Sequence, residues 1–146
     1  MTTTAAALDT FTIAEEIVVK ASIEKTFDSL IANLGRLNQT PDGVPLPMTL
    51  EARPGGRWFR DFPGDDGHLW AFVQSIKRPA LLELWGPLFM SNAASSNVQY
   101  QLSEIEGGTL IRFQQTLMGG FPEEMRPKFR KGWLDVLDRT RATAEA

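Results

Sequence analysis

The chain has 146 residues, of which 42% are hydrophobic and 23% charged, so it can form one folded domain with a buried core. Its formal net charge of −3 excludes a general attraction to nucleic acid or to an acidic membrane surface. The lack of cysteine excludes disulfides, a thiolate nucleophile and a cysteine-based metal site.

Residues 1–10 are rich in threonine and alanine, and they lack the basic residues and apolar core of a signal peptide or membrane anchor. We therefore expect a flexible N-terminus over 1–10, a single domain over 11–146, and a cytoplasmic location without membrane insertion. Residues 11–21 have the β-branched composition of a first strand. Ser22 is then a suitable N-cap for a helix that Gly35 ends. The apolar face of this helix consists of Phe27, Leu30, Ile31 and Leu34.

The middle of the chain predicts an antiparallel sheet. Residues 38–47 contain three prolines and a glycine, which exclude a regular element and predict a loop from helix to sheet. From residue 48 onward, short β-rich segments alternate with turn signals, so neighbouring strands are expected to pair antiparallel. The expected strands are 48–52, 57–62, 68–77, 81–85, 97–103 and 109–117, with an apolar loop or bent strand over 88–96.

The C-terminal segment predicts a long amphipathic helix, which needs a broad concave surface to cover its apolar stripe. We expect Gly132, which has no Cβ, to let the helix backbone approach the sheet. Pro127 predicts either a bend in the helix or a short lead-in turn from Pro122, with the main helix starting near Pro127. The stripe consists of Phe129, Trp133, Val136, Leu137 and Thr140.

A series of short motifs follows this order of elements and resembles the helix-grip (START/SRPBCC) superfamily. More narrowly, residues 11–144 resemble the family named for the activator of the heat-shock chaperone ATPase. The resemblance implies an α+β fold in which a curved antiparallel sheet of six to seven strands wraps around a long C-terminal helix, with a short helical segment after the first strand. The motifs are Pro54-Gly55-Gly56-Arg57-Trp58, Gly67-His68-Leu69-Trp70, Ile76-Lys77-Arg78-Pro79, Gly107-Gly108-Thr109 and Gly132-Trp133 through Leu137.

The resemblance also implies a range of functions. Members of the superfamily bind lipids, polyketides, hormones or other apolar molecules between sheet and helix. Some members are cyclases or hydrolases, and others only transport or sense. The sequence therefore predicts a hydrophobic cavity under the long helix.

Two positions depart from the pattern of the family. In many relatives the strand after the Gly-Gly-Thr turn ends on a histidine, where this chain has Gln115, whose amide cannot titrate. Arg60 stands two residues after Trp58, where relatives place an inward apolar side chain. Because a buried guanidinium needs a partner, Arg60 predicts either an ion pair with Glu51 or Glu83, or a contact with an acidic group of a ligand.

The strand predicted at 68–77 is apolar on both faces. By analogy with the family, the smaller side chains face the helix and leave room for a ligand. Trp70 and Phe72 would then lie on the outer face and form a subunit contact in a homodimer. The alternative is that this bulky pair belongs to the core. The smaller side chains are Leu69, Ala71 and Val73.

The sequence assembles no catalytic or metal site. His68 is the only histidine and lies beside the acidic turn at 63–67, whereas a metal site needs more than one such ligand. No serine has the context of a nucleophile elbow. Glu123 and Glu124 are explained as first-turn residues that complement the helix dipole. We therefore predict no catalytic residue, no metal and no cofactor.

The expected ligand site lies between sheet and helix, with the Tyr100 hydroxyl, Arg60 and Gln115 as its polar points. This combination favours a ligand with an apolar body and one polar or acidic group. The expected ligand-binding residues are Trp58, Arg60, Leu69, Ala71, Val73, Leu84, Tyr100, Ile111, Phe113, Gln115, Phe129, Trp133 and Leu137.

Three functions fit this sequence. The preferred one is binding of a small apolar or amphipathic molecule, such as a lipid, because the helix stripe is aromatic and the sequence supplies no pair of titratable groups. The second is a cyclase or hydrolase using the same cavity, which needs His68, Glu51 or Glu83 to face the cavity as an acid or base. The third, implied only by the name of the resembled family, is interaction with a chaperone.

Overall fold

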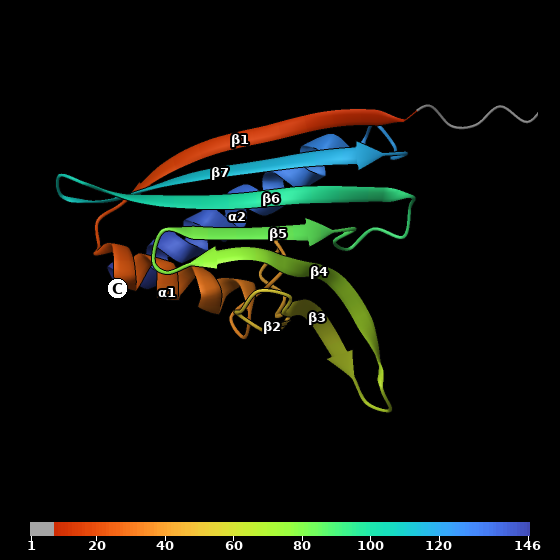
Figure 1. Ribbon diagram of the computed structural model, residues 1–146, viewed down its shortest axis with the longest axis horizontal. Helices are drawn as coiled ribbons and strands as arrows, with labels where there is room; N and C mark the ends of the chain where they lie inside the picture. The colour runs from red at the N-terminus through yellow and green to blue at the C-terminus, as the bar shows by residue number, and fades with distance from the viewer. Residues whose placement is uncertain (1–7) are drawn as a thin grey trace, which may run out of the picture.

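The computed structural model describes residues 8–146 and consists of one curved sheet with two helices on its concave side (Figure 1). The seven strands are antiparallel in the order β1-β7-β6-β5-β4-β3-β2, which confirms the predicted α+β architecture. No helix among residues 8–146 is long and apolar enough to cross a bilayer. The elements are β1 Asp9–Val19, α1 Ile23–Leu34, β2 Thr49–Leu50, β3 Arg57–Phe62, β4 Asp66–Lys77, β5 Leu81–Gly86, β6 Ala94–Ile105, β7 Gly108–Gly119 and α2 Met125–Glu145.

The N-terminal part of the fold begins earlier than the sequence pattern suggests. β1 starts at Asp9, which pairs with Gly119 of β7, so the strand includes the last two residues of the segment expected to be flexible. The rest of that expectation, over residues 1–7, lies outside the described residues. α1 begins and ends as predicted, because the Ser22 hydroxyl accepts the backbone N–H of Lys25 at 3.1 Å and Gly35 caps the C-terminus.

The start of α2 follows the lead-in form of the prediction. The helix begins at Met125, and its backbone N–H donates to the Pro122 carbonyl at 3.0 Å across a short turn. Pro127 therefore lies in the first turn, where its missing N–H would have had no partner within the helix. The interpretation of Glu123 and Glu124 as first-turn residues is wrong, since both precede the helix.

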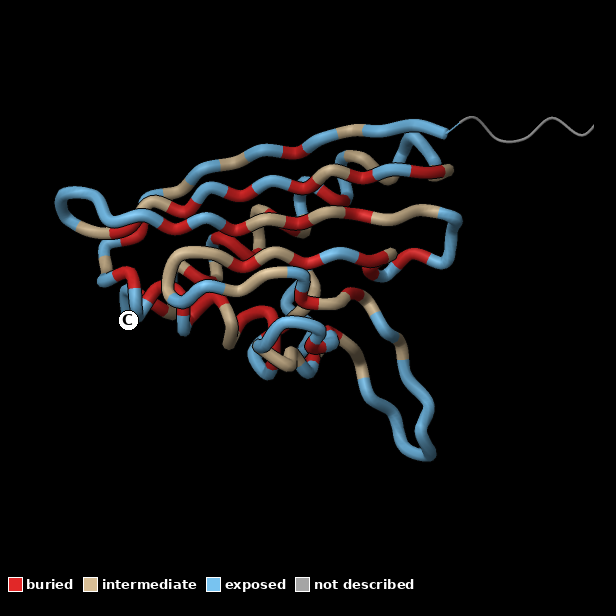
Figure 2. The backbone as a smooth tube through the Cα atoms, viewed as in Figure 1, coloured by how far each residue is buried: buried red, intermediate tan, exposed pale blue. Residues whose placement is uncertain are grey.

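The apolar stripe of α2 is buried against the sheet, as predicted (Figure 2). Strict alternation on β7 turns every second side chain toward the helix, because successive side chains of a strand point to opposite faces. The Trp133 ring packs on Phe113 at 4.9 Å between centroids and on Tyr100 at 6.4 Å. The inward side chains of β7 are Thr109, Ile111, Phe113, Gln115 and Leu117.

Gln115 joins α2 to two strands through a buried hydrogen-bonded chain. Its Oε1 accepts the indole N–H of Trp133 at 2.6 Å, and its Nε2 donates to Ser96 Oγ on β6 at 2.9 Å. Gln115 is fully buried, so these bonds satisfy polar groups that water cannot reach. The Gln115 amide thus fixes the position of the long helix on the sheet.

A bulge in β4 overturns the expected division of its faces. Trp58 pairs with Ala71 while Phe59 pairs with Leu69, which leaves Trp70 without a partner on β3. Trp70 consequently turns to the inner side and packs on Trp58 at 5.1 Å between centroids, and Leu69 is 40% exposed. The bulged backbone lies so close to β5 that a Cβ on Gly86 would overlap the Trp70 carbonyl.

As a result, Trp70 and Phe72, the aromatic pair expected together on one face, lie on opposite faces of the sheet. Trp70 is an inner residue, whereas Phe72 stays on the outer face and packs on Trp85 at 5.3 Å between ring centroids. Ala71 and Val73 are buried, as the family analogy predicted. The expectation that Leu69 faces the helix is wrong, and of the two alternatives for Trp70 the core position is the one observed. Simple alternation cannot register an inserted residue.

Arg60 makes neither of its expected ion pairs. The β3–β4 hairpin runs beyond the body of the domain, so the face that Arg60 shares with Trp58 is no longer covered there (Figures 1 and 2). The half-buried guanidinium of Arg60 stacks over Phe62 at 4.8 Å and needs no carboxylate. Glu51 instead pairs with Arg57, and Glu83 accepts amide N–H groups from strand β6.

The Glu51 carboxylate holds the β2–β3 edge that carries Trp58. It accepts the backbone N–H and Nε–H of Arg57, both at 2.9 Å, and the Nη2–H at 3.0 Å. These hydrogen bonds to Arg57 lower the pKa of Glu51 from 4.5 to about 2. The ionised form of Glu51 is therefore the one that the fold stabilises.

Replacing Gln115 by leucine is expected to lower the free energy of unfolding by about 1–3 kcal/mol, because the buried Trp133 N–H and Ser96 hydroxyl lose their partner. Urea denaturation measures the effect. Gln114→Leu is the matched control, since Gln114 is exposed on the opposite face of the same strand and should change stability by less than about 0.5 kcal/mol. Equal stability of the two variants would contradict this role for Gln115.

The Glu51→Gln variant is expected to be less stable than the parent at neutral pH and equally stable near pH 2. A carboxyl whose pKa is lower in the folded state stabilises the fold above its unfolded pKa, and this contribution disappears as the pH falls from 4.5 toward about 2. Urea midpoints of both proteins across this range measure the difference. In an Arg57→Ala background the pH-dependent difference should vanish, and its persistence would assign it to another partner.

Candidate functional site

A pocket of about 320 Å³ opens beside the N-terminal half of α2. It lies between this helix, the loop after α1, strands β3 and β4, and the loop after β5. Its volume is at the lower end of the range for small-molecule sites. We call it the α2 pocket, and its lining residues are Asn38, Gln39, Thr40, Pro41, Leu46, Trp58, Trp70, Leu88, Phe89, Lys128, Phe129, Gly132, Trp133 and Val136.

One side of the α2 pocket is a continuous run of aromatic rings. Trp58 packs edge-on against Trp70 at 5.1 Å between centroids, Trp70 lies 6.0 Å from Phe89, and Phe89 lies 5.2 Å from Phe129. These spacings are those of favourable aromatic pairs. Trp133 adds a fifth ring on the helix side, so the wall offers ring surface to an occupant.

The three indole N–H groups of the pocket all donate hydrogen bonds to acceptors within the protein. Trp58 Nε1 donates to the Leu34 carbonyl at 2.7 Å, and Trp133 Nε1 donates to Gln115. Trp70 Nε1 donates to His68 Nδ1 at 3.2 Å. The indoles therefore present apolar surface to the pocket, and no indole donor is left for an occupant.

Gly132 does not act as the sequence predicted. A Cβ built on Gly132 would meet no atom within 4 Å, so the absence of a side chain is not needed for α2 to approach the sheet. Gly132 instead lines the α2 pocket, between Phe129 and Trp133 in sequence. The missing side chain keeps this part of the pocket open.

The loop after α1 forms the opposite wall and is held in place by Arg139 of α2. The Arg139 guanidinium donates to the carbonyl of Gln39 at 3.2 Å and to that of Leu37 at 3.4 Å, while Nε donates to Asp135 at 2.8 Å. A bridge between Gln39 and Pro45 closes the base of the loop. The wall is thus fastened to the same helix that carries the aromatic stripe.

The polar groups of the pocket lie on this loop and at the start of α2. Asn38 Nδ2 donates to the Leu46 carbonyl at 3.0 Å, and Thr40 Oγ1 accepts the backbone N–H of Val44 at 3.2 Å, so both side chains are engaged within the loop. Among the described residues that line the pocket, Lys128 is the only charged one. Histidine and carboxylate side chains are not among the lining residues.

The structure brings only part of the predicted site residues to the pocket. Trp58, Phe129 and Trp133 line it. Arg60 and Leu69 lie on the β3–β4 hairpin, away from the lining. The remaining residues are packed in the core that fills the space under the middle of α2, namely Ala71, Val73, Leu84, Tyr100, Ile111, Phe113, Gln115 and Leu137.

Tyr100 and Gln115 are therefore core residues and do not provide polar points in the pocket. The Tyr100 hydroxyl is buried without a hydrogen-bond partner in the described structure, and burial raises the pKa of this phenol. Gln115 is committed to Trp133 and Ser96. Both groups lie behind the rings that line the pocket.

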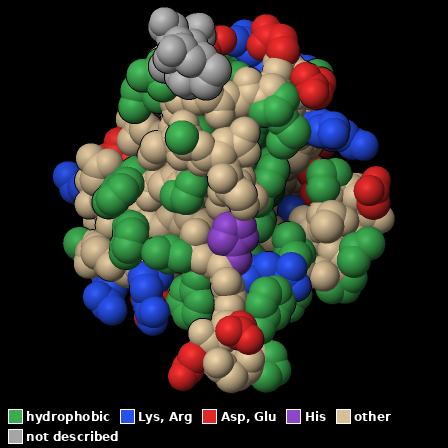
Figure 3. Space-filling view, turned by 90° about the vertical axis from the view of Figure 1, so that its right-hand side faces the viewer, with side chains coloured by type: hydrophobic (Ala, Val, Ile, Leu, Met, Phe, Trp, Pro, Cys, Tyr) green, Lys and Arg blue, Asp and Glu red, His purple; other side chains and the backbone are tan. Residues whose placement is uncertain are grey.

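The residues proposed as an acid or base lie outside the lining. His68 is a half-buried residue of β4, visible at the surface in Figure 3, and it accepts the Trp70 indole N–H. Glu51 is held ionised by Arg57, which is the opposite of the raised pKa that a general acid requires. Glu83 is bonded to Asn97 and Gln99. Within residues 8–146, no group of three or more histidine or acidic side chains could hold a metal ion.

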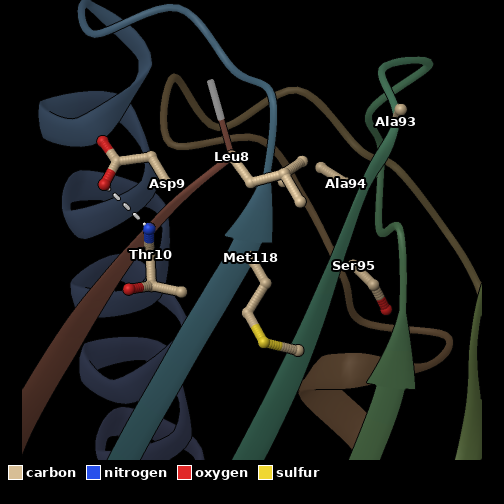
Figure 4. A pocket seen from close by; sticks show the side chains of 8 residues that line it. Leu8, Asp9, Thr10, Ala93, Ala94, Ser95 and Met118 are labelled. Atoms are coloured by element: carbon tan, nitrogen blue, oxygen red, sulfur yellow. Dashed lines mark hydrogen bonds between the residues drawn. The ribbon is translucent and has the colours of Figure 1, made fainter. Parts of the chain in front are cut away.

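A second hollow, of about 490 Å³, lies where β1 begins and β7 ends (Figure 4). Leu8 and Met118 border it and are 84% and 53% exposed. Thr10 and Ser95 contribute small polar side chains at its edge. This hollow is open to solvent and lies outside the space between sheet and helix, so the α2 pocket is the better candidate site.

Sequence reasoning missed the residues that loops and local irregularities bring to the pocket. The sequence predicts the loop at 38–47 only as a connection, and it leaves open whether Trp70 lies on the outer face or in the core. Two signals were present in the sequence: an apolar run at Leu88 and Phe89 outside any strand, and a glycine inside a helical pattern at Gly132. Both features mark positions where the chain forms a pocket wall.

Comparison with solved structures finds this fold in proteins of low sequence identity. A putative uncharacterized protein from Rhizobium leguminosarum has a TM-score of 0.72 at 19% identity, over 97% of this chain and 99% of that chain. A protein from Chromobacterium violaceum has a TM-score of 0.68 at 17% identity, over 93% and 99%. The di-domain ARO/CYC StfQ from the steffimycin biosynthetic pathway has a TM-score of 0.66 at 10% identity, and the match covers 93% of this chain and 51% of StfQ.

These structural likenesses establish the fold and nothing further about activity. No curated protein matches the sequence. The family model for Activator of Hsp90 ATPase homolog 1-like protein matches residues 20–145, which is most of the chain and includes every motif that carried the resemblance. The chain therefore belongs to the family of Activator of Hsp90 ATPase homolog 1-like proteins.

Proposed function

We propose that this protein binds a small, largely apolar molecule in the α2 pocket and performs no chemistry on it. The observation that supports the proposal best is the open aromatic wall. The rings of Trp58, Trp70, Phe89 and Phe129 form one side of a space of about 320 Å³. Burial of apolar surface in such a space is favourable by roughly 25 cal/mol per Å².

The composition of the lining supports binding over catalysis. Acid–base catalysis of the cyclase or hydrolase kind needs a group that can exchange a proton with the substrate inside the site. His68, Glu51 and Glu83 each lie outside the lining and have internal partners. The α2 pocket has the composition of a recognition site with a polar rim.

Gly132 supplies a second argument, which rests on stability. Glycine inside a helix costs about 1 kcal/mol relative to alanine. Nothing nearby requires it, because a Cβ at this position would meet no atom within 4 Å. A position that lowers stability and widens a pocket is explained by the use of that space.

Gly132→Phe is expected to fill the α2 pocket and weaken the binding of the neutral fluorescent probe N-phenyl-1-naphthylamine by at least about tenfold. Gly132→Ala should retain binding within about twofold and raise the free energy of unfolding by about 0.5–1 kcal/mol. Probe fluorescence measures affinity, and urea denaturation measures stability.

Ala142→Phe is the control for added bulk, since Ala142 is exposed on the same helix and does not line the pocket. It should leave probe affinity unchanged. Two results would contradict the proposal: absence of probe binding to the unmodified protein, or equal binding by the unmodified protein and a folded Gly132→Phe variant.

A further inference from the structure

We propose that the occupant of the α2 pocket is an organic anion, with its apolar body among the rings and its acidic group at the mouth beside Lys128. This inference rests on the proposed function and names the class of ligand. Three observations support it. The lining carries a positive charge, Lys128 forms no ion pair within residues 8–146, and the indole N–H groups donate to acceptors of the protein.

The lining of the α2 pocket has one sign of charge. Within residues 8–146, Lys128 is the only charged residue of the lining, and the other polar residues are Asn38, Gln39 and Thr40, which are neutral. A single cation beside apolar walls attracts anions, because low-dielectric surroundings screen its field less than water does. A neutral ligand would gain no charge–charge attraction to Lys128, and a cationic ligand would be repelled by it.

Lys128 differs from Arg126 and Arg130 of α2, because within residues 8–146 it forms no ion pair. Arg126 pairs with Asp9, and Arg130 Nε lies 2.9 Å from Glu15 Oε1. In the described part of the chain, Lys128 takes part in none of the ion pairs. Its ammonium group is therefore available to a ligand at the mouth of the pocket.

The place of Lys128 on the helix is unfavourable for stability. It lies in the first turn of α2, where the partial positive charge of the helix dipole favours anions and disfavours cations. The first turn itself contains no acidic residue, while Glu124 is the N-cap residue and Glu123 forms an ion pair with Arg126. The ammonium group of Lys128 is thus the charge beside the pocket that a bound anion would neutralise.

The orientation of the ligand follows from the donors inside the pocket. Trp58, Trp70 and Trp133 donate their N–H groups to protein acceptors, so the interior offers an acidic group no indole donor. Burial of an anion among the rings would leave it without a hydrogen bond from the indoles, and an unpaired buried charge costs several kcal/mol. The acidic group is therefore excluded from the ring-lined interior and held at the rim, where Lys128 and solvent can meet it.

Two probes with the same ring system test this inference. N-phenyl-1-naphthylamine is neutral, and 8-anilinonaphthalene-1-sulfonate adds one sulfonate to the same scaffold. We expect Lys128→Met to weaken sulfonate binding by about three- to tenfold, the effect of losing a charge-assisted contact at a partly exposed site, and to leave the neutral probe within about twofold. Fluorescence titration and competition between the probes measure both affinities.

Lys131→Met is the matched control, because Lys131 carries the same charge on the same helix and does not line the α2 pocket. It should change neither affinity. Raising the salt concentration should weaken sulfonate binding to the unmodified protein and to Lys131→Met, and weaken it less in Lys128→Met. Gly132→Phe should reduce binding of both probes, which places them in the pocket.

The possible results separate the two proposals. If the neutral probe does not bind the unmodified protein, the proposed function fails. If the neutral probe binds but Lys128→Met affects both probes equally or neither, the pocket remains and the anion inference is overturned. Sulfonate binding that is insensitive to Gly132→Phe also overturns the inference, because the anion is then held elsewhere.

Discussion

The hydrogen bond from the Trp133 indole to Gln115 is the interaction on which the rest of the site depends. It fixes the rotation of α2 at the point where the helix crosses β7, and Gln115 extends the link to Ser96 on β6. Because this hydrogen bond holds the Trp133 ring in place, the rings of Tyr100 and Phe113 pack against it and fill the space below the middle of the helix. The open volume is consequently displaced toward the start of α2.

The position of the pocket near the start of α2 explains why its walls consist of different kinds of structure. The sheet side consists of rigid strands that carry Trp58 and Trp70, and the helix side presents Phe129 and Gly132. The remaining wall is a loop without regular structure, fastened through Arg139. A helix-grip fold with its deep interior packed can thus still offer a site, because the loop and the sheet do not close fully on the end of the helix.

The sequence predicted the fold well because the decisive signals were periodic. The stripe from Phe129 to Thr140, the alternation on β7 and the cap at Ser22 are local patterns that survive unchanged in the structure. The order of elements and the match to the family over residues 20–145 agree with this. Local patterns therefore determined the architecture.

The site was predicted less well because it depends on departures from those patterns. One inserted residue in β4 exchanges the faces of Leu69 and Trp70, and alternation alone cannot locate an insertion. The side of β3 that carries Arg60 is not covered by other elements, because the β3–β4 hairpin extends beyond the body of the domain (Figure 1). How far it extends depends on the lengths of the elements that pack against the sheet. The positions of Lys128 and of the loop after α1 beside the pocket likewise depend on packing between segments distant in the sequence.

The attachment of the loop wall by Arg139 has a consequence for the width of the pocket. The three bonds from its guanidinium nitrogens to Asn33, Leu37 and Gln39 are 3.2–3.4 Å long, whereas the strands around the rings are paired along their length. Local unfolding of a loop with few buried bonds requires far less free energy than separation of a sheet. The width of the pocket on this side is therefore set by the contact of the loop with Arg139, and the pairing of the strands leaves it unaffected.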